Sequence, residues 1–337
     1  MSTIKDVAAH AGVSYSTVSH VLNGTRPVSE EARDRVLQAV QLLGYLPSAV
    51  ARSLKTSETH ILGVLVPNIT NPFFAELTRG IEDRCHQAGY SVFLCNSDDD
   101  TKRQALYHKT LLERRVDGLL LASTGGVDSV PHGWASYGVP CVIVDRPVPG
   151  LKADWVRVDN EAGARIAVEH LLALGHRAIG CIGGPSDVDV SRARAQGWYQ
   201  ALKAARVKAH ENWLVEGDFT CESGYVAART LLAHRAANGN MTAIFASNDL
   251  MAMGALRAAA ECGISVPKQM SVIGFDGIEL GGYVHPGLST VCYPIRGLGE
   301  QAAQVLLERI AQPRKAVREL SFTPKLLLRE STAAPQN

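Results

Sequence analysis

From Ile61 to about residue 330, short apolar runs alternate with longer amphipathic segments. The apolar runs predict buried strands at 61–66, 91–95, 118–121, 140–144, 178–182, 243–246 and 271–274. The segments between them predict helices at 73–88, 101–115, 161–174, 192–205, 223–233 and 249–262. Strands that alternate with helices form parallel sheets with helices on both faces. Because the series divides into two runs of similar length, we expect an α/β module of two lobes.

The length of 337 residues exceeds that of one ordinary compact domain. We expect an all-α headpiece over 1–46, a hinge helix and linker over 47–60, the two-lobed module over 61–330, and a tail over 331–337. The first lobe should comprise 61–160 with 293–322, and the second should comprise 161–292 with 323–330.

The headpiece contains three segments in which apolar residues recur at helical spacing, at 4–11, 15–23 and 30–43. The first follows Thr3, with Asp6 three positions later as in a capping box, and Ser14 is a suitable N-cap for the second. A glycine follows each segment, where a tight helix exit favours a residue without Cβ. A helix, a short turn and a second helix with a polar face are typical of a helix-turn-helix.

The polar face of the segment 15–23 carries groups that can hydrogen-bond base edges in the major groove of DNA. No acidic residue lies between Asp6 and Glu30, so no carboxylate would repel phosphate there. The candidate DNA-binding residues of the headpiece are Thr3, Ser14, Tyr15, Ser16, Thr17, His20, Asn23 and Arg26. A small helical bundle with no role in DNA binding is the alternative.

Residues 47–55 predict a hinge helix that is too short to be stable alone in water. DNA could order such a segment, and a leucine between basic side chains could wedge a base step from the minor groove. The candidate DNA-binding residues of the hinge are Ser48, Arg52, Leu54 and Lys55. An ordinary linker with one exposed leucine is the alternative.

Polar residues follow several of the predicted strands, with aromatic residues close by. Since the carboxyl ends of parallel strands meet at one edge of a sheet, we expect these side chains to converge on a cleft. They are Asn71 with Phe73 and Phe74, Asp145 with Arg146, Asn248 with Asp249, and Asp276, together with Arg194 at the start of a helix. Charged groups and rings of this kind can hold a polyhydroxylated ligand. Any one of them taken alone could instead be a helix cap or a surface ion pair.

Several classes of function find no support in the sequence. It contains no P-loop, no G-x-S-x-G and no G-x-G-x-x-G, and its histidines show no metal-ligand spacing, so we expect no enzyme, no cofactor and no metal site. The 7 cysteines form no CxxC pair, which favours reduced thiols. We expect a cytoplasmic protein without membrane contact, because the sequence has neither an apolar run of membrane-span length nor a signal-peptide segment.

Several stretches resemble the lactose repressor family of transcription regulators, and most closely its ribose- and purine-repressor branch. They are TIKDVA at 3–8, VSYSTVSHVLN at 13–23, PSAVARSLK at 47–55, RVDGL at 115–119, LGH at 174–176, SND at 247–249 and IGFD at 273–276. The resemblance spans essentially the whole chain. It implies a DNA-binding repressor with a helix-turn-helix headpiece and a periplasmic-binding-protein-like sensor.

The resemblance also implies partners and residue roles. It implies a homodimer on a pseudo-palindromic operator, with Tyr15, Ser16 and His20 as the main base readers and Leu54 inserted at a central step. It further implies an effector that closes the lobes and changes how the two hinges face each other. By similarity to ribose-binding periplasmic proteins, the effector-binding residues are Asn71, Phe73, Phe74, Asp145, Arg146, Arg194, Phe219, Asn248 and Asp276, and Tyr293 occupies a further effector-binding position at which the chain departs from those proteins.

The expected effector is a small sugar such as ribose that controls a sugar-utilisation operon, with a purine as the alternative. Tyr293 stands where the sugar-binding relatives carry glutamine, which leaves the exact sugar open. The C-terminal RESTAAPQN contains no leucine heptad, so we expect a dimer rather than a tetramer. A sugar receptor without regulatory role and an α/β enzyme acting on a sugar are rival interpretations.

Overall fold

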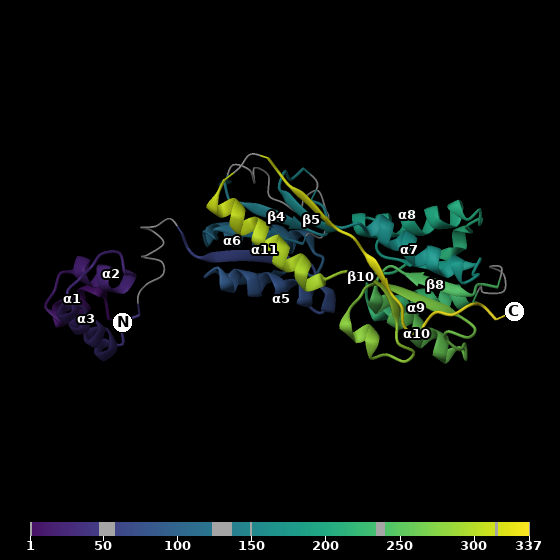
Figure 1. Ribbon diagram of the computed structural model, residues 1–337, viewed down its shortest axis with the longest axis horizontal. Helices are drawn as coiled ribbons and strands as arrows, with labels where there is room; N and C mark the ends of the chain where they lie inside the picture. Colours follow the sequence, from purple (N-terminus) through teal and green to yellow (C-terminus); the bar gives the residue numbers. More distant parts are fainter. Residues whose placement is uncertain are drawn as a thin grey trace. The chain divides into compact units, whose positions relative to one another are not determined.

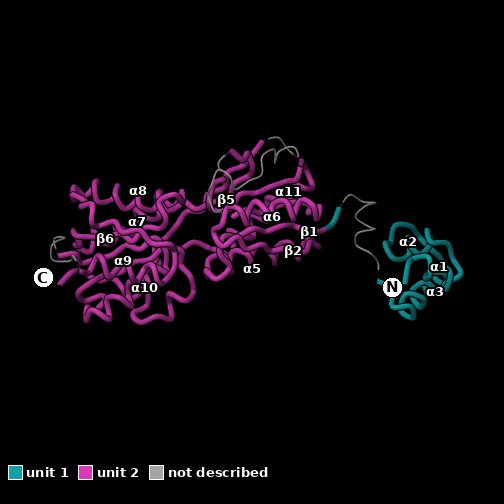
Figure 2. Tube along the Cα trace, turned by 180° about the vertical axis from the view of Figure 1, so that it is seen from behind, with its two compact units in different colours: residues 1–59 teal, residues 60–337 magenta. Residues whose placement is uncertain are grey.

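The computed structural model describes residues 2–46, 58–122, 137–148, 150–233, 240–313 and 316–336. The expected hinge helix, with Ser48, Arg52, Leu54 and Lys55, lies outside the described residues. The chain divides into two compact units, residues 1–59 and residues 60–337, which Figure 2 distinguishes by colour.

The first unit contains three helices around a small apolar core. They are α1 (Ile4–Ala11), α2 (Tyr15–Asn23) and α3 (Glu30–Leu43). Val7, Val18 and Val36, one from each helix, are fully buried together. The predicted helix-turn-helix is confirmed, including the left-handed glycine that ends each helix.

Side-chain caps fix where these helices begin. The Thr3 hydroxyl accepts a hydrogen bond from the Asp6 N–H while the Asp6 carboxylate accepts one from the Thr3 N–H, so the predicted capping box is present. Ser14 and Ser29 cap α2 and α3 in the same way, each through a backbone N–H three residues later. These bonds satisfy amides that have no partner inside the helix.

The second unit contains two six-stranded sheets. The strands of the first sheet are β1 (Ile61–Val66), β2 (Ser91–Asn96), β3 (Gly118–Leu121), β4 (Cys141–Val144), β5 (Asp154–Val158) and β11 (Glu319–Phe322). They lie in the order β11-β5-β4-β3-β1-β2, and every neighbouring pair is parallel. In the central register, Leu62 of β1 stands opposite Val92 on one side and Gly118 on the other.

The strands of the second sheet are β6 (Ile179–Gly183), β7 (Leu214–Glu216), β8 (Ala243–Ala246), β9 (Ser271–Asp276), β10 (Ser289–Cys292) and β12 (Lys325–Leu327). They lie in the order β12-β10-β9-β8-β6-β7. All neighbours are parallel except β12, which pairs antiparallel with β10. Residues 323–324 connect β11 of the first sheet to β12 of the second.

Helices cover both faces of each sheet (Figure 1). On the first sheet, α5 (Pro72–Gln87) and α11 (Ile295–Ala311) pack together on one face and α6 (Thr101–Glu113) packs on the other. On the second sheet, α7 (Asn160–Ala173) packs with α8 (Asp189–Ala204), and α9 (Cys221–Ala233) packs with α10 (Asp249–Glu261). Two short 3-10 helices lie at Glu211–Trp213 and Glu279–Gly282. The predicted α/β sensor is confirmed, and none of its described helices is long and apolar enough to cross a membrane.

The sequence pattern missed α11 and the strands β5, β7, β10, β11 and β12. Strand β5 shows one reason, because charged residues interrupt its apolar pattern. Asp154 in β5 is fully buried, and Arg309 of α11 donates to both of its carboxylate oxygens at 2.6 and 2.7 Å. A partner far along the chain satisfies this buried charge, and local periodicity cannot reveal such a partner.

Helices α9 and α10 approach each other closely at two glycines. A Cβ on Gly224 would lie 2.3 Å from the Met251 backbone, and one on Gly254 would lie 2.1 Å from the Cys221 carbonyl oxygen. The separation of these helices therefore depends on the absence of side chains at both positions.

We expect Gly224→Val to lower the free energy of unfolding by about 1–3 kcal/mol, since overpacking must push the two backbones apart. Differential scanning calorimetry should show a lower Tm. Val226→Ala, at an exposed position on the same helix, is the control and should leave the Tm nearly unchanged. Equal Tm values for the two variants would contradict the close-packing argument.

Candidate functional site

Helix α2 presents a polar surface on the first unit. Tyr15 is 65% exposed, Ser16 is exposed, and His20 is half-buried one turn after Ser16. Helical spacing places these three side chains on one side of α2. The His20 Nδ1 lies 2.8 Å from the hydroxyl of Thr25, and this contact orients the imidazole.

The other predicted DNA-binding residues of the headpiece surround this surface. The Ser14 hydroxyl caps α2 and also contacts the hydroxyls of Ser16 and Thr17 at 2.7 and 2.9 Å. Asn23 donates to the Ser19 carbonyl at the other end of α2, and Arg26 is exposed just beyond it. Thr3 is also exposed, but it lies at the start of α1, where its side chain caps that helix, and not on α2.

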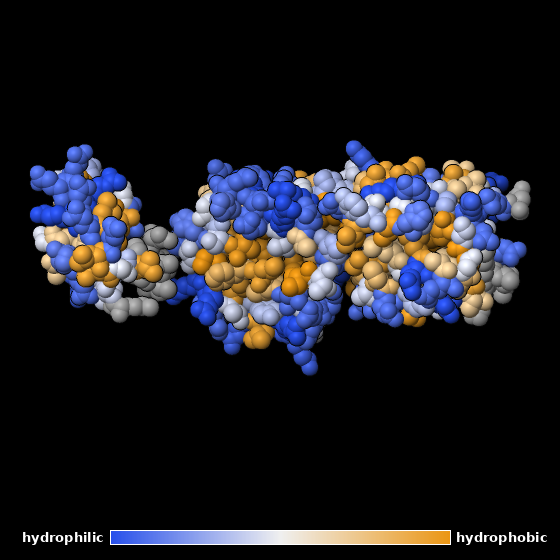
Figure 3. All heavy atoms as spheres, turned by 90° about the horizontal axis from the view of Figure 1, so that it is seen from below, coloured by the Kyte–Doolittle hydropathy of each residue, from blue (hydrophilic) through white to orange (hydrophobic). Residues whose placement is uncertain are grey.

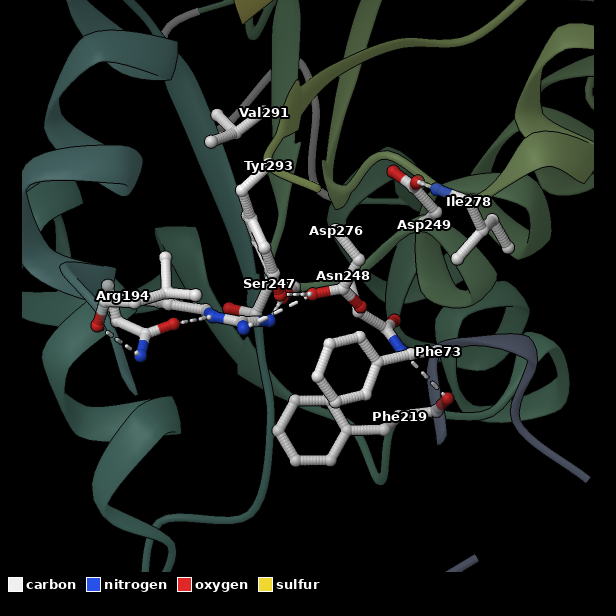
Figure 4. A network of polar contacts seen from close by, with 12 residues as sticks. Phe73, Arg194, Phe219, Ser247, Asn248, Asp249, Asp276, Ile278, Val291 and Tyr293 are labelled. Atoms are coloured by element: carbon white, nitrogen blue, oxygen red, sulfur yellow. Dashed lines mark hydrogen bonds and ion pairs between the residues drawn. The ribbon is translucent and has the colours of Figure 1, made fainter. Parts of the chain in front are cut away.

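Arg194 is the anchor of the polar cluster in the second unit (Figure 4). Its side chain is buried and donates to Asn160 Oδ1 at 2.8 Å and to the Ser247 carbonyl at 2.5 Å, and its Nη2 lies 3.2 Å from Asp276 Oδ1. The guanidinium carbon lies 3.8 Å from the centroid of the Phe275 ring. These contacts hold the guanidinium in a fixed orientation.

The position of Arg194 within its helix differs from the prediction. Helix α8 begins at Asp189, so Arg194 lies in its second turn and not at its start. Val188 is the N-cap and makes no side-chain hydrogen bond. The sequence therefore carried no capping signal for this helix start.

Tyr293 joins the same cluster from the segment that follows β10. Its hydroxyl donates to Asp276 Oδ1 at 3.1 Å, and its ring meets Phe73 and Phe275 edge-on at centroid distances of 6.3 and 6.2 Å. Burial, with the Asp276 carboxylate next in importance, raises the pKa of Tyr293 well above its usual value. The phenol therefore keeps its proton and acts as a donor.

Asp145 and Arg146 follow β4. Asp145 is 3% exposed, and its Oδ1 has no hydrogen-bond partner within the described part of the chain. Its charge acts on Arg194, Asp276 and Tyr293, which places it beside the same cluster. Arg146 bonds to Asp99 at 2.9 Å.

Arg146 also stacks between two rings. Its guanidinium carbon lies 5.5 Å from the ring centroids of both Phe74, on α5, and Phe219, which precedes α9. Contacts of this kind favour a cation over the face of an aromatic ring. Because α5 packs on the first sheet and α9 on the second, Arg146 links the two lobes of the second unit.

The two predicted asparagines are helix caps as well as cluster members. Asn71 Oδ1 accepts from the Phe73 N–H and caps α5, while Asn248 Oδ1 accepts from the Met251 N–H and caps α10. The Asn248 amide nitrogen also donates to the Phe219 carbonyl at 3.0 Å. Both caps therefore orient residues that line the space between the lobes.

Cavities open beside the cluster, and two of them are lined by Asp145 or Arg146. One of about 440 Å³ is lined by residues that include Asp145, Asn160 and Val190. The other, of about 120 Å³, includes Asn71, Phe74, Arg146 and Phe219 in its lining. The structure thus brings together the effector-site residues that the sequence proposes, at the carboxyl ends of the strands.

Two carboxyl groups near the cluster have raised pKa values. Burial raises the pKa of Asp276 to about 6, with Arg194 opposing the shift and Asp145 adding to it. Burial also raises the pKa of Asp249 to about 8, and the nearby Asp276 adds to that shift. The sequence grouped Asp249 with the cleft, but its carboxyl points away from Arg194 toward Ile278 (Figure 4).

Some residues of the site were missed by sequence reasoning. Asn160 and Ser247 hold Arg194, and Asp99 holds Arg146. Ser247 and Asp99 had a visible signal, because each lies just past a strand, as the predicted site residues do. Asn160 follows β5, which the sequence pattern did not identify.

Comparison with protein families explains this arrangement. Residues 3–48 match the bacterial regulatory proteins of the lacI family, and residues 168–332 match the periplasmic binding protein-like domain. The HTH-type transcriptional repressor PurR of Photobacterium profundum is 41% identical over 332 residues, which cover 98% of each chain. The chain belongs to the lacI family. It is therefore a DNA-binding transcription regulator and not an enzyme.

Other lacI-family members match over most of the chain. The ribose operon repressor of Escherichia coli is 41% identical over 98% of this chain and 100% of its own length. The lac repressor dimer bound to operator and the anti-inducer ONPF has a TM-score of 0.85 at 30% identity, covering 99% of both chains. A regulator of the family from Enterococcus faecium with bound ribose has a TM-score of 0.74 at 34% identity, covering 82% of this chain and 100% of its own.

Asp249 should give the stability of this lacI-family protein a pH dependence. Its pKa is about 8 in the folded protein against a usual value of 3.8, so between these values the folded state holds a proton that the unfolded state has released. The free energy of unfolding should therefore fall as pH rises from about 4 to about 8. Asp249→Asn, which does not titrate, should show a flatter dependence in urea unfolding followed across this range. Parallel curves for the two proteins would argue against the raised pKa.

Proposed function

We propose that this regulator is a cytoplasmic homodimer that represses a sugar-utilisation operon and responds to a small sugar such as ribose. The cytoplasm is where a bacterial regulator meets its operator. The proposal assigns the effector to the cluster around Arg194 and the operator to the exposed face of α2.

The observation that carries the assignment of the effector is the unpartnered Oδ1 of the buried Asp145. A buried carboxylate oxygen without a hydrogen bond is costly, and a ligand hydroxyl would satisfy it. Arg194, Asp276 and Tyr293 lie next to it and offer further donors and acceptors. Arg146, Phe74 and Phe219 add a charge and two apolar rings.

This donor set favours a sugar over a purine. A sugar carries hydroxyls around its whole rim, and each loses water on burial, so its site must supply many donors and acceptors. A purine is flat and needs a stacking slot with a few in-plane hydrogen bonds. The ribose bound to the regulator from Enterococcus faecium and the name of the ribose operon repressor support the same choice.

The homodimer is supported by apolar surface on the second unit. Figure 3 shows a broad apolar area on the face that it presents. Exposed apolar side chains of this unit include Phe93 and Leu94 on the edge strand β2, and Leu280 and Tyr283 after β9. Apolar surface of this kind often marks a protein interface. The lac repressor of known structure is a dimer on its operator.

We expect Tyr15→Ala to weaken operator binding about tenfold or more, since it removes an exposed group that can contact base edges. Leu54→Ala should also weaken binding, because only a bulky apolar group can fill an opened base step. Gel-shift titration measures both effects. Leu42→Ala, which alters an exposed side chain of α3, is the control and should bind the operator like the wild type. If Tyr15→Ala also binds the operator with wild-type affinity, α2 is not part of the DNA-binding surface.

We expect Asp145→Ala to weaken sugar binding about tenfold to a hundredfold, since one unmatched hydroxyl costs roughly 1–3 kcal/mol. Arg194→Ala should abolish the response to the sugar, while operator binding should survive in both variants. Asp187→Ala, at an exposed position before α8, is the matched control. Calorimetry with ribose measures the effect, and micromolar binding of hypoxanthine or guanine without sugar binding would assign the site to a purine.

A further inference from the structure

Asp249 is a buried carboxyl group that the effector site does not use directly. It is the first residue of α10, and its side chain is completely buried. Its Oδ2 accepts the Ile278 N–H at 2.8 Å, and its Oδ1 lies 2.5 Å from the Thr290 hydroxyl. One carboxyl group therefore joins the start of α10, the segment after β9, and strand β10.

Strand β9 passes directly over this carboxyl group. A Cβ on Gly274 would lie 2.2 Å from Asp249 Oδ1, so only glycine fits at this point of the strand. Two residues further on, β9 ends at Asp276, whose carboxylate contacts Arg194 and Tyr293. The Asp249 carboxyl group thus lies against the C-terminal end of β9, the part of the strand that carries Asp276.

The backbone at Asp276 is held in an unfavourable conformation. Its φ is 111°, in the left-handed half of the map that side-chain-bearing residues rarely adopt, and Gly277 follows with a φ of 76°. Such a conformation persists only where the surroundings enforce it. The hydrogen bond from the Ile278 N–H to Asp249 fixes the backbone two residues after Asp276. This bond helps to hold Asp276 in its unfavourable backbone conformation.

We propose that Asp249 is a positioning residue of the effector site: it holds residues 277–278 and thereby sets the direction in which Asp276 presents its carboxylate. The role of Asp276 as a sugar ligand rests on the function proposed above, whereas the placement of its backbone does not. Asp249 itself does not touch the effector, because its carboxyl faces the interior of the second lobe.

Burial favours the neutral form of the Asp249 carboxyl group. Its raised pKa, caused by burial and by the charge of Asp276, keeps a proton on it near neutral pH. The Thr290 hydroxyl donates to Oδ1 at 2.5 Å and also lies 3.2 Å from the Val291 carbonyl oxygen, while Oδ2 accepts from the Ile278 N–H. Asparagine keeps an oxygen that accepts from the Ile278 N–H, and its NH₂ can donate to the Thr290 hydroxyl, which then donates to the Val291 carbonyl.

The test uses the full chain and two readouts. Hydrogen–deuterium exchange of a peptide covering residues 275–279, without any ligand, reports whether the backbone around Asp276 is held. Calorimetric titration with D-ribose reports whether the site is intact. The variants are Asp249→Ala and Asp249→Asn, with Thr290→Val as a milder change and Leu231→Ala as a control that removes a buried side chain from α9 in the same lobe.

We expect Asp249→Ala to speed exchange in residues 275–279 and to weaken D-ribose binding about tenfold to a hundredfold, because the backbone that carries Asp276 is no longer held. Asp249→Asn should restore both readouts to within about twofold of the wild type. Thr290→Val should give a smaller change of the same kind, and it keeps the test open if Asp249→Ala does not fold. Leu231→Ala should lower the Tm without selective exchange at residues 275–279.

The outcomes separate this proposal from the assignment of a sugar. If exchange responds as expected but the wild type binds no D-ribose, the sugar assignment fails and the positioning role stands. If Asp249→Ala and Thr290→Val leave exchange at residues 275–279 unchanged, or if Asp249→Asn fails to rescue, the positioning role is overturned.

Discussion

The buried contact between Arg194 and Asp276 is the interaction around which the polar cluster of the second lobe is organised. A charge taken out of water must find its partners within the protein, and Arg194 finds them on α7, on the loop after β8, and on β9. Each of these partners is fixed by its own secondary structure. The pair therefore forms only when this sheet and its helices are assembled, and it lies in the effector site that we propose.

The two units obtain their stability in different ways. The headpiece packs a few small apolar side chains and depends on side-chain caps and glycine exits that lie within a few residues of each helix. The second unit depends on partners far apart in the sequence, such as Arg309 with Asp154 and Tyr293 with Asp276. Sequence patterns within a few residues can predict the helix ends of the headpiece, but they cannot predict the long-range pairs of the second unit.

This difference explains how much the sequence could predict. Thr3, Asp6 and Ser14 predicted the helices of the headpiece because capping is a short-range interaction, and the apolar runs predicted the central strands of both sheets. Strand β5 was missed because the carboxylate of Asp154 breaks its pattern and is satisfied only by a residue of α11. Asp249 was grouped with the cleft because it follows a strand, whereas its direction is set by Thr290 and Ile278, which no local pattern connects to it.

The chain passes between the two sheets three times, after β5, after β10 and after β11. Neither sheet is consequently complete until α11, β11 and β12 have been synthesised, since α11 and β11 belong to the first sheet and β12 to the second. The headpiece, by contrast, is continuous in sequence and is synthesised before the second unit, and its contacts are local. Premature termination would therefore release polypeptides that carry a folded helix-turn-helix and an incomplete sensor. The unpaired strand edges and exposed apolar surface of such a sensor make it prone to aggregation and to proteolysis.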